Sequence, residues 1–513
     1  MIKYLSSNNT VDVLIVIFFS FFINFYYSNI GVLPQDTFAY YDTAFRILNG
    51  ATPFKDYWTV SGPAIDYIQS IFFYLFGVNW QVYTFNGSVI NCLITLTLYF
   101  LLKTYELKRG LNFFYCFCFS VLANPSMGVA FPDHYSTFFS LIAVFFFLIA
   151  IKLDKKILWY SIPFAFFLAF FSKQSPSSYI FISTIILIFF YMISFKKINF
   201  IKHLVFSTVG CIFIFASFIF INEINFALFF NQYFLFPQTI ADERLSEYQF
   251  TFNNLILNFK FIYVLLIFTL FLVFSKIKTN KKIDEIILSS LSLIFISISL
   301  IFHQIITKNF IFIFFLIPLL ASFLHLYDYK KKQNEKLISI FLIIFTIFCT
   351  TKYHLRFNEN RKMLNLESVN LNNAIDAKTI HPSLKGLKWK TKRFENNSKL
   401  EIENIKKSIE IIKNDNSNKM IETNYLFFSA IANEDLNNPS RWPSLGDASN
   451  PSFDNNYHIF YKDFINKIVE KKEIKSIYST INNRENIFFI FDKKCKSSEL
   501  VENFLYKLDL TKC

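Results

Sequence analysis

The stretch HLVFSTVGCIFIFASFIFIN, residues 203–222, contains no Asp, Glu, Lys or Arg and decides the class of fold. The hydrocarbon core of a bilayer is about 30 Å thick, so a helix needs about 20 mostly apolar residues to cross it. Comparable runs recur along the 513-residue chain, whose mean hydropathy is +0.37. This pattern excludes a soluble multi-domain protein and predicts an α-helical polytopic membrane protein.

We predict about eleven membrane-spanning helices from these apolar runs. They lie at residues 11–30, 81–102, 111–125, 136–151, 157–172, 176–195, 203–222, 259–275, 284–302, 309–326 and 336–351. The segment 64–77 is shorter and contains Asp66, so we expect a helix near the membrane interface there, with a twelfth span as the alternative.

The basic residues indicate the orientation of these helices. The formal net charge is +14, and Lys and Arg cluster in alternate loops, at 103–109, 152–156, 196–202, 276–282 and 330–336. Because Lys and Arg concentrate in cytoplasmic loops, we predict the amino terminus inside and residues 352–513 outside. The basic charge therefore reports orientation, and we expect a lipid bilayer and no nucleic acid as a partner.

The composition changes after residue 351, which divides the chain into a transmembrane domain, 1–351, and an extracytoplasmic domain, 352–513. A helix near 398–414 is predicted by the helical spacing of four isoleucines, Ile402, Ile405, Ile409 and Ile412. We expect a small mixed α/β domain, with strands at 419–430, 474–479 and 487–491 and helices at 460–471 and 497–508. An oxidising compartment permits a disulfide between its two cysteines, Cys495 and Cys513.

The first predicted outer loop, residues 31–63, is long and rich in polar residues. One face of an amphipathic helix lying on the membrane is predicted by the spacing of Phe38, Tyr41, Phe45 and Leu48. Asp36 stands at the start of this helix, where it fits either an N-cap or a catalytic carboxylate held at a fixed position. Further along the helix, Asp42 and Arg46 have the spacing of an i, i+4 ion pair.

Other ionisable and polar residues gather at span ends on the same predicted face. They are Asp133, His134, Lys173, Gln174, Arg244, His303 and Lys308. Each one alone fits a solvated turn, but ionisable groups at span ends are energetically expensive and usually functional. In the outer domain, candidate carbohydrate contacts are Arg441, Trp442 and Asp447, and a plain loop is the alternative.

The string Tyr41-Asp42-x-Ala44-x-x-Ile47-Leu48-x-Gly50-x-x-Pro53-Phe54-x-Asp56, together with Asp36 before it, resembles the GT-C polytopic glycosyltransferases. Within that superfamily, the chain is most similar to the group of protein O-mannosyltransferases and the lipid A aminoarabinose transferase. Gly62-Pro63 and Pro132-Asp133-His134 match the same layout. The sequence departs from relatives that follow the first acid with Glu, because Thr37 stands there.

This resemblance implies a polyprenyl-phosphate-linked sugar donor and a lipid, glycan or protein acceptor on the outer face. It assigns the catalytic aspartate to Asp36 and a second active-site acid to Asp133. It leaves a divalent metal open, and no cofactor is otherwise expected. We expect the protein in the cytoplasmic (inner) membrane of a bacterium, with residues 352–513 in the periplasm.

The chemistry of an inverting transfer agrees with this assignment. A carboxylate takes the proton of the acceptor, and cations or donors stabilise the leaving phosphate. We expect Asp36 as the base and the following residues around the substrates: Arg46, Asp56, His134, Lys173, Gln174, Arg244, His303 and Lys308. The alternatives are a transporter or flippase of lipid-linked sugars and a polymerase or ligase of lipid-linked glycans.

Overall fold

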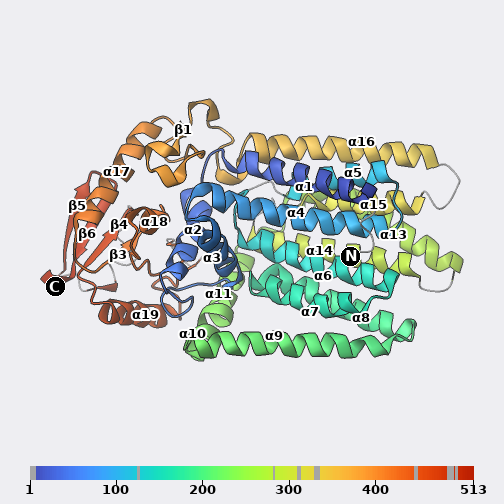
Figure 1. The fold of residues 1–513 in the computed structure, drawn as a ribbon, viewed down its shortest axis with the longest axis horizontal. Coiled ribbons are helices and arrows are strands. Elements are labelled where there is room, and N and C mark those ends of the chain that lie inside the picture. The colour runs from blue at the N-terminus through green and yellow to red at the C-terminus, as the bar shows by residue number, and fades with distance from the viewer. Residues whose placement is uncertain are drawn as a thin grey trace.

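The computed structural model describes residues 7–123, 127–280, 284–308, 313–328, 335–443, 449–481, 490–491 and 495–513. It consists mostly of helices that form a long bundle, and a region of mixed helices and strands covers one end of the bundle (Figure 1). Asp447 and residues 487–489 of a predicted strand lie outside the described residues, as do Lys281, Lys282 and the lysines at 330–332.

Among the described residues, eight helices are long and apolar enough to cross a membrane, which indicates a membrane protein. They are α1 (Ser7–Ser28), α4 (Trp80–Thr104), α6 (Pro132–Leu153), α8 (Gln174–Ser194), α9 (Ile201–Ile221), α13 (Lys260–Asn280), α14 (Glu285–Thr307) and α16 (Glu335–His354). The predicted domain boundary after residue 351 falls inside α16.

The other three predicted spans form shorter helices. These are α5 (Arg109–Ala123) and α7 (Lys156–Phe170), each of 15 residues, and α15 (Leu316–Asp328), of 13 residues. At 1.5 Å per residue they reach only about 20–23 Å, which is less than the thickness of a bilayer core. The predicted interfacial helix also forms, as α3 (Ala64–Phe76). The count of eleven spans therefore stays a prediction.

The bundle has a buried centre and an exposed rim. In α6, 83% of the apolar segment is buried by its neighbours α4, α7 and α8. In contrast, only 6% of the segment that contains α9 is buried, and α9 packs against α7 along the lower edge of the bundle in Figure 1. The side chains of Phe206, Phe213 and Phe220 on α9 are more than 70% exposed, as expected for a helix that faces lipid.

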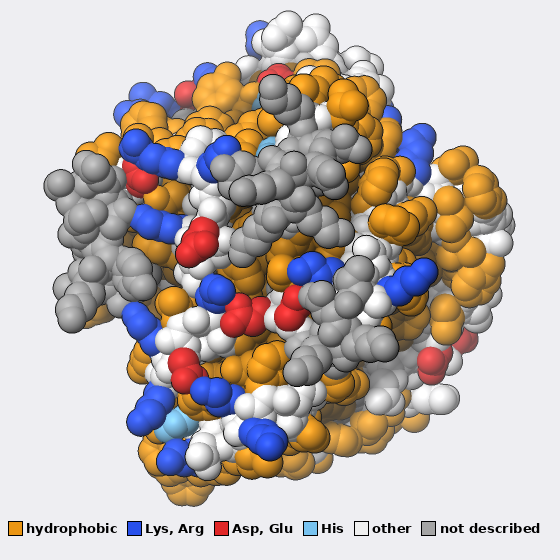
Figure 2. Space-filling model, turned by 90° about the vertical axis from the view of Figure 1, so that its right-hand side faces the viewer, with side chains coloured by type: hydrophobic (Ala, Val, Ile, Leu, Met, Phe, Trp, Pro, Cys, Tyr) orange, Lys and Arg blue, Asp and Glu red, His pale blue; other side chains and the backbone are white. Residues whose placement is uncertain are grey.

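The end of the bundle remote from the mixed region carries many Lys and Arg side chains (Figure 2). Ion pairs connect the helix ends there: Lys152 Nζ lies 2.9 Å from the Glu285 carboxylate, and Lys197 Nζ lies 2.9 Å from the Asp154 carboxylate. The described lysines and arginines of the loops that the sequence assigned to one side of the membrane thus gather at one end of the bundle.

The mixed region contains two small sheets. In the first, β1 (Ile375–Asp376) is antiparallel to β2 (Lys388–Trp389). The second has the order β3-β4-β6-β5, in which β3 (Lys419–Glu422) is parallel to β4 (Ser476–Ser479). The strands β6 (Leu505–Asp509) and β5 (Lys496–Val501) are antiparallel to their neighbours. The helices of this region are α17 (Ser398–Asn414), α18 (Phe428–Ala432) and α19 (His458–Lys471).

Part of the predicted structure of this region is confirmed and part is wrong. The four isoleucines of α17 are buried, and Cys495 and Cys513 form a disulfide. The predicted helix at 497–508 is instead the hairpin of β5 and β6, which turns at Asn503 with a φ of +51°. The predicted strand at 419–430 is confirmed only over Lys419–Glu422, because α18 begins soon after it. The segment forms a hairpin because β6 pairs with β4, and this pairing outweighs the weak local preference for a helix.

The first outer loop forms α2 (Pro34–Leu48), as the sequence predicted, but protein covers this helix on all sides. Every residue from Thr37 to Arg46 is buried, because α2 packs between α3 and α18 of the mixed region. The loop reaches α7 at Gly62, where an added Cβ would lie 1.9 Å from the carbonyl oxygen of Phe171. Only glycine therefore allows the loop to approach this helix so closely.

A buried ion pair fastens the mixed region to the start of α3, next to the end of the first outer loop. The Arg441 guanidinium donates to the Asp66 carboxylate and to Ser61, and both charged side chains are 0% exposed. Next to this pair, the Trp58 amide donates to the Pro439 carbonyl at 2.7 Å, and the Arg441 amide donates back to the Trp58 carbonyl at 3.0 Å. The segment around Arg441 is thus held by side chains and backbone together.

Replacing Asp66 with Ala should destabilise the protein by about 3–5 kcal/mol, because it leaves the Arg441 charge buried without a partner. Thermal unfolding of the purified protein in detergent would measure the loss. The matched control is Lys471→Ala: this side chain is 58% exposed and pairs with Asp56 at 3.4 Å, so the change should cost less than about 1 kcal/mol. Equal shifts for the two variants would contradict the dominant role of the buried pair.

Candidate functional site

Five of the catalytic and substrate-binding residues selected from the sequence line one cavity of about 480 Å³. They are Asp36, Asp133, Lys173, Gln174 and Arg244. The cavity lies where α2, α6 and α8 meet α11 (Phe236–Ser246) and the segment that follows Arg441. Its volume is in the range of small-molecule sites, and it combines charged groups with aromatic walls.

Asp36 is a free carboxylate in the first turn of α2. The N-cap of this helix is Leu33, so the N-cap interpretation of Asp36 is wrong, and Thr37 Oγ1 accepts from the Leu33 amide at 3.1 Å. Asp36 forms no hydrogen bond with a described residue and is partly exposed because it lines the cavity. Burial within the surrounding protein, reinforced by the charge of Asp133 and opposed by Lys173, raises its pKa to about 6.

Asp133, in contrast, is held by several partners at the start of α6. Lys173 Nζ donates to its two carboxylate oxygens at 3.0 and 2.8 Å, and His303 Nε2 lies 2.6 Å from Oδ1. The side chains of Asp133 and His303 are only 4% and 1% exposed. The two carboxylates of the cavity therefore differ: Asp133 is neutralised by an ammonium group, and Asp36 is available.

The cations of the site differ in the same way. Lys173 forms an ion pair with Asp133. Arg244, in the last turn of α11, lines the cavity and forms no hydrogen bond or ion pair with a described residue. Gln174 acts as a tether, since its Nε2 donates to the carbonyls of Val60 and Tyr233 at 3.0 and 2.5 Å. Arg244 is therefore a cation available to an anionic ligand.

Besides His303, which contacts Asp133, four selected residues are absent from the cavity lining. Arg46 does not pair with Asp42: its Nε donates to Asp435 at 2.7 Å. Asp56 Oδ2 accepts from the Thr52 amide at 2.9 Å. The ring of His134 stacks on Phe138, and Lys308 Nζ pairs with the Glu247 carboxylate at 2.8 Å. These side chains hold the scaffold, and each has a partner that the sequence alone could not reveal.

The structure adds residues to the site that the sequence reasoning missed. Ser175, Tyr179, Tyr233 and Ser449 line the cavity. Of the three candidates in the outer domain, Trp442 lines the cavity and Arg441 pairs with Asp66. The position of Ser175 directly after Lys173-Gln174 was a usable signal, but nothing local marks Tyr233, which stands in a run of aromatic residues.

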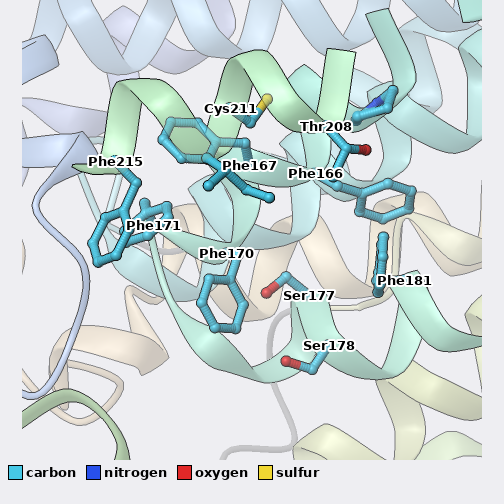
Figure 3. Close-up of a pocket in the computed structure, with 12 residues that line it drawn as sticks. Phe166, Phe167, Phe170, Phe171, Ser177, Ser178, Phe181, Thr208, Cys211 and Phe215 are labelled. Carbon is cyan, nitrogen blue, oxygen red and sulfur yellow. The ribbon is translucent and has the colours of Figure 1, made fainter. Parts of the chain in front are cut away.

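An apolar groove of about 320 Å³ adjoins the cavity between α7, α8 and α9 (Figure 3). Its wall consists mainly of Phe166, Phe167, Phe170, Phe171 and Phe181. Ring contacts connect it to the cavity lining: Phe171 stacks on Tyr233 at 5.9 Å, and Phe170 lies 6.1 Å from Phe234. Aromatic side chains of the groove wall thus contact aromatic side chains of the cavity lining.

Within the described ranges, no three His, Cys, Asp or Glu side chains converge in a way that could hold a metal ion. A scan of protein-family models and a search of curated proteins found no match to the chain. The geometry of the site therefore carries the functional argument.

Asp36→Asn should stabilise the protein at pH 8 by up to about 3 kcal/mol, because it removes a carboxylate that the fold disfavours in its ionised form. The pKa of Asp36 is 3.8 in the unfolded chain and about 6 in the folded protein. Relative to its ionised form, Asp36 therefore adds to the free energy of unfolding fully below pH 3.8, and this contribution is lost as the pH rises through about 6. The advantage of the variant should therefore vanish near pH 4. Thermal unfolding at both pH values checks this.

The matched comparison is Asp133→Asn, which should have the opposite effect at pH 8. An amide at this position leaves the Lys173 ammonium without its counter-ion, and we expect a loss of about 3 kcal/mol. Destabilisation by both variants would contradict the different environments assigned to the two carboxylates.

Proposed function

We propose that this protein is a membrane glycosyltransferase that moves a sugar from a polyprenyl-phosphate donor to a lipid, glycan or protein acceptor. The observation that carries the proposal is that a carboxylate, Asp36, and a guanidinium, Arg244, line the same cavity, beside an apolar groove. Neither group has a hydrogen-bond or ion-pair partner among the described residues. The resemblance of the first outer loop to GT-C glycosyltransferases points to the same reaction.

Asp36 is the general base in this proposal. Its carboxylate has no described partner to displace, and a pKa of about 6 leaves it mostly ionised and still basic near neutral pH. It takes the proton of the acceptor hydroxyl while that oxygen bonds to the anomeric carbon from the face opposite the phosphate, so the transfer inverts the configuration.

Arg244 binds the donor phosphate, which gains negative charge as its bond to the sugar breaks. A guanidinium matches a phosphate with two parallel hydrogen bonds, and partial burial at the cavity lining strengthens the attraction. Lys173 contributes less charge to the phosphate because Asp133 already neutralises it. The aromatic groove accepts the first isoprenoid units, which fits a lipid that remains in the bilayer while its head group reacts.

The same proposal includes the orientation and location of the chain. Lysines gather at the end of the bundle remote from the sheet region, as expected for a cytoplasmic face. The Cys495–Cys513 disulfide lies in the sheet region, and disulfides persist in oxidising compartments. We therefore place the cavity at the periplasmic face of a bacterial inner membrane.

Asp36→Asn should lower transfer by about 10²–10⁴-fold with the protein still folded, because the acceptor loses its base. Membranes that contain the protein would be incubated with a panel of radiolabelled polyprenyl-phosphate hexoses and pentoses, and the labelled product would be extracted. The wild-type rate at low donor concentration should fall about tenfold per pH unit below pH 6. Full activity of the Asn variant would remove Asp36 from this role.

Arg244→Ala and Lys308→Ala form a matched pair for the phosphate site. Arg244 lines the cavity, whereas Lys308 lies nearby on the outside and pairs with Glu247. Loss of the guanidinium should cost about 10²–10³-fold in transfer, and loss of the exposed ammonium less than about threefold. Equal losses would contradict the assignment of the phosphate to Arg244.

A topology reporter fused after residue 355 should be active only outside the cytoplasm. The expectation follows from the charge asymmetry of the loops, and a second fusion after residue 154 should report the cytoplasm. Alkaline phosphatase and green fluorescent protein fusions measure the two sides. Cytoplasmic fluorescence from both fusions would refute the eleven spans between an inner amino terminus and an outer carboxy-terminal domain.

A further inference from the structure

Asp133, His303 and Ser175 form a continuous chain of hydrogen bonds that ends at the cavity. His303 Nε2 lies 2.6 Å from Asp133 Oδ1, and His303 Nδ1 lies 2.8 Å from Ser175 Oγ. The carboxylate and the imidazole are buried, whereas Ser175 is partly exposed and lines the cavity. A carboxylate, an imidazole and a hydroxyl in this order have the connectivity that activates a serine nucleophile.

The partners of Asp133 fix the direction of each hydrogen bond. Lys173 Nζ donates to both carboxylate oxygens, so the carboxylate is ionised and can only accept. His303 must therefore carry its proton on Nε2, which leaves Nδ1 of the neutral ring as an acceptor. Ser175 then donates its hydroxyl proton to Nδ1, and the lone pairs of its Oγ are left for the cavity.

The backbone presents Ser175 at the junction of the polar cavity and the apolar groove. Ser175 has extended dihedral angles, φ −113° and ψ 130°, at the start of α8. Ser177 and Ser178, two and three residues later on the same helix, line the apolar groove (Figure 3). A ligand with its hydrocarbon chain in the groove thus reaches Ser175 with the group at the end of that chain.

We propose that Ser175 is the nucleophile of a second activity, the cleavage or transfer of carboxylic esters whose acyl chain lies in the aromatic groove. This activity does not depend on the proposed sugar transfer, because Asp36 takes no part in it. The sense of the imidazole is reversed with respect to serine proteases, in which Nε2 faces the serine. Both nitrogens of the ring accept and return protons, so the reversal preserves the chemistry.

The step balances within the chain. Ser175 Oγ bonds to the carbonyl carbon of the ester while its proton moves to His303 Nδ1, and Asp133 stabilises the imidazolium that forms. The carbon–alkoxy bond then breaks, and the alcohol leaves with the proton from Nδ1. Water or a second alcohol attacks the acyl-serine, gives its proton to Nδ1, and releases the acid or the new ester as Oγ regains a proton.

A fluorophosphonate probe tests the nucleophile directly, because attack by Oγ forms an oxygen–phosphorus bond and expels fluoride. The full chain, purified in detergent, should be labelled at Ser175, with the adduct located by peptide mass mapping. Ser175→Ala should abolish labelling, and His303→Gln should slow it by about 10²-fold. Ser183→Ala is the matched control, since this partly exposed serine of the same helix lines neither the cavity nor the groove and donates to the Ile180 carbonyl, at 2.9 Å, so labelling should persist.

Two further variants test whether the ester chemistry is independent of Asp36 and whether it uses the groove. Asp36→Asn should retain labelling even though it stops sugar transfer, so the two proposals fail independently. Thr208 is exposed on α9 and lines the groove, so Thr208→Trp places a bulky ring there. The variant should lose the preference for p-nitrophenyl octanoate over p-nitrophenyl acetate. It should still cleave the acetate ester, whose acyl group is too short to need the groove. Absence of labelling in the folded wild-type chain, or equal labelling of the Ser175→Ala variant, would overturn the proposal.

Discussion

The buried ion pair between Arg441 and Asp66 is the constraint on which the rest of the structure depends. Neither side chain contacts solvent, so the two charges stabilise each other only while the mixed region stays docked on α3. The residue after Arg441 is Trp442, which lines the cavity, and Ser61, which accepts from Arg441, lines it too. One electrostatic contact therefore fixes two walls of the site, although its partners are separated by most of the chain.

Within that frame, the site depends on the unequal treatment of two carboxylates. Asp133 receives an ammonium group and an imidazole, which satisfy its charge and orient it. Asp36 receives no described donor and sits close enough to Asp133 to be affected by its charge. Environments that separate two neighbouring acids in this way are typical of sites that assign them different roles. The start of α2 at Pro34 contributes to this difference. It makes Leu33 the N-cap, and the Leu33 amide donates to Thr37 Oγ1 rather than to the Asp36 carboxylate.

The sequence grouped several residues that line one cavity, but it did not distinguish them from neighbours that face elsewhere. Charge and span ends selected Asp36, Asp133, Lys173, Gln174 and Arg244 correctly as neighbours, because all lie at one end of their helices. His134 and Lys308 each stand one residue beyond a cavity-lining position, and that single step turns the side chain toward Phe138 or Glu247. Likewise, Arg46 donates to Asp435, which lies 389 residues later in the sequence. The segment 497–508 forms a hairpin because its second strand pairs with β4. Such choices depend on the assembled fold.

The wall that Trp442 and Ser449 contribute has a consequence for the biosynthesis of the protein. Asp36 leaves the ribosome about 400 residues before Trp442 and Ser449, which form the last wall of its cavity. During that interval the bundle can insert and the carboxylate can take its place, but the cavity stays open on one side. The fold thus orders events in time: a chain that ends before Trp442 holds Asp36, Asp133 and Arg244 but lacks one wall of the cavity that they line.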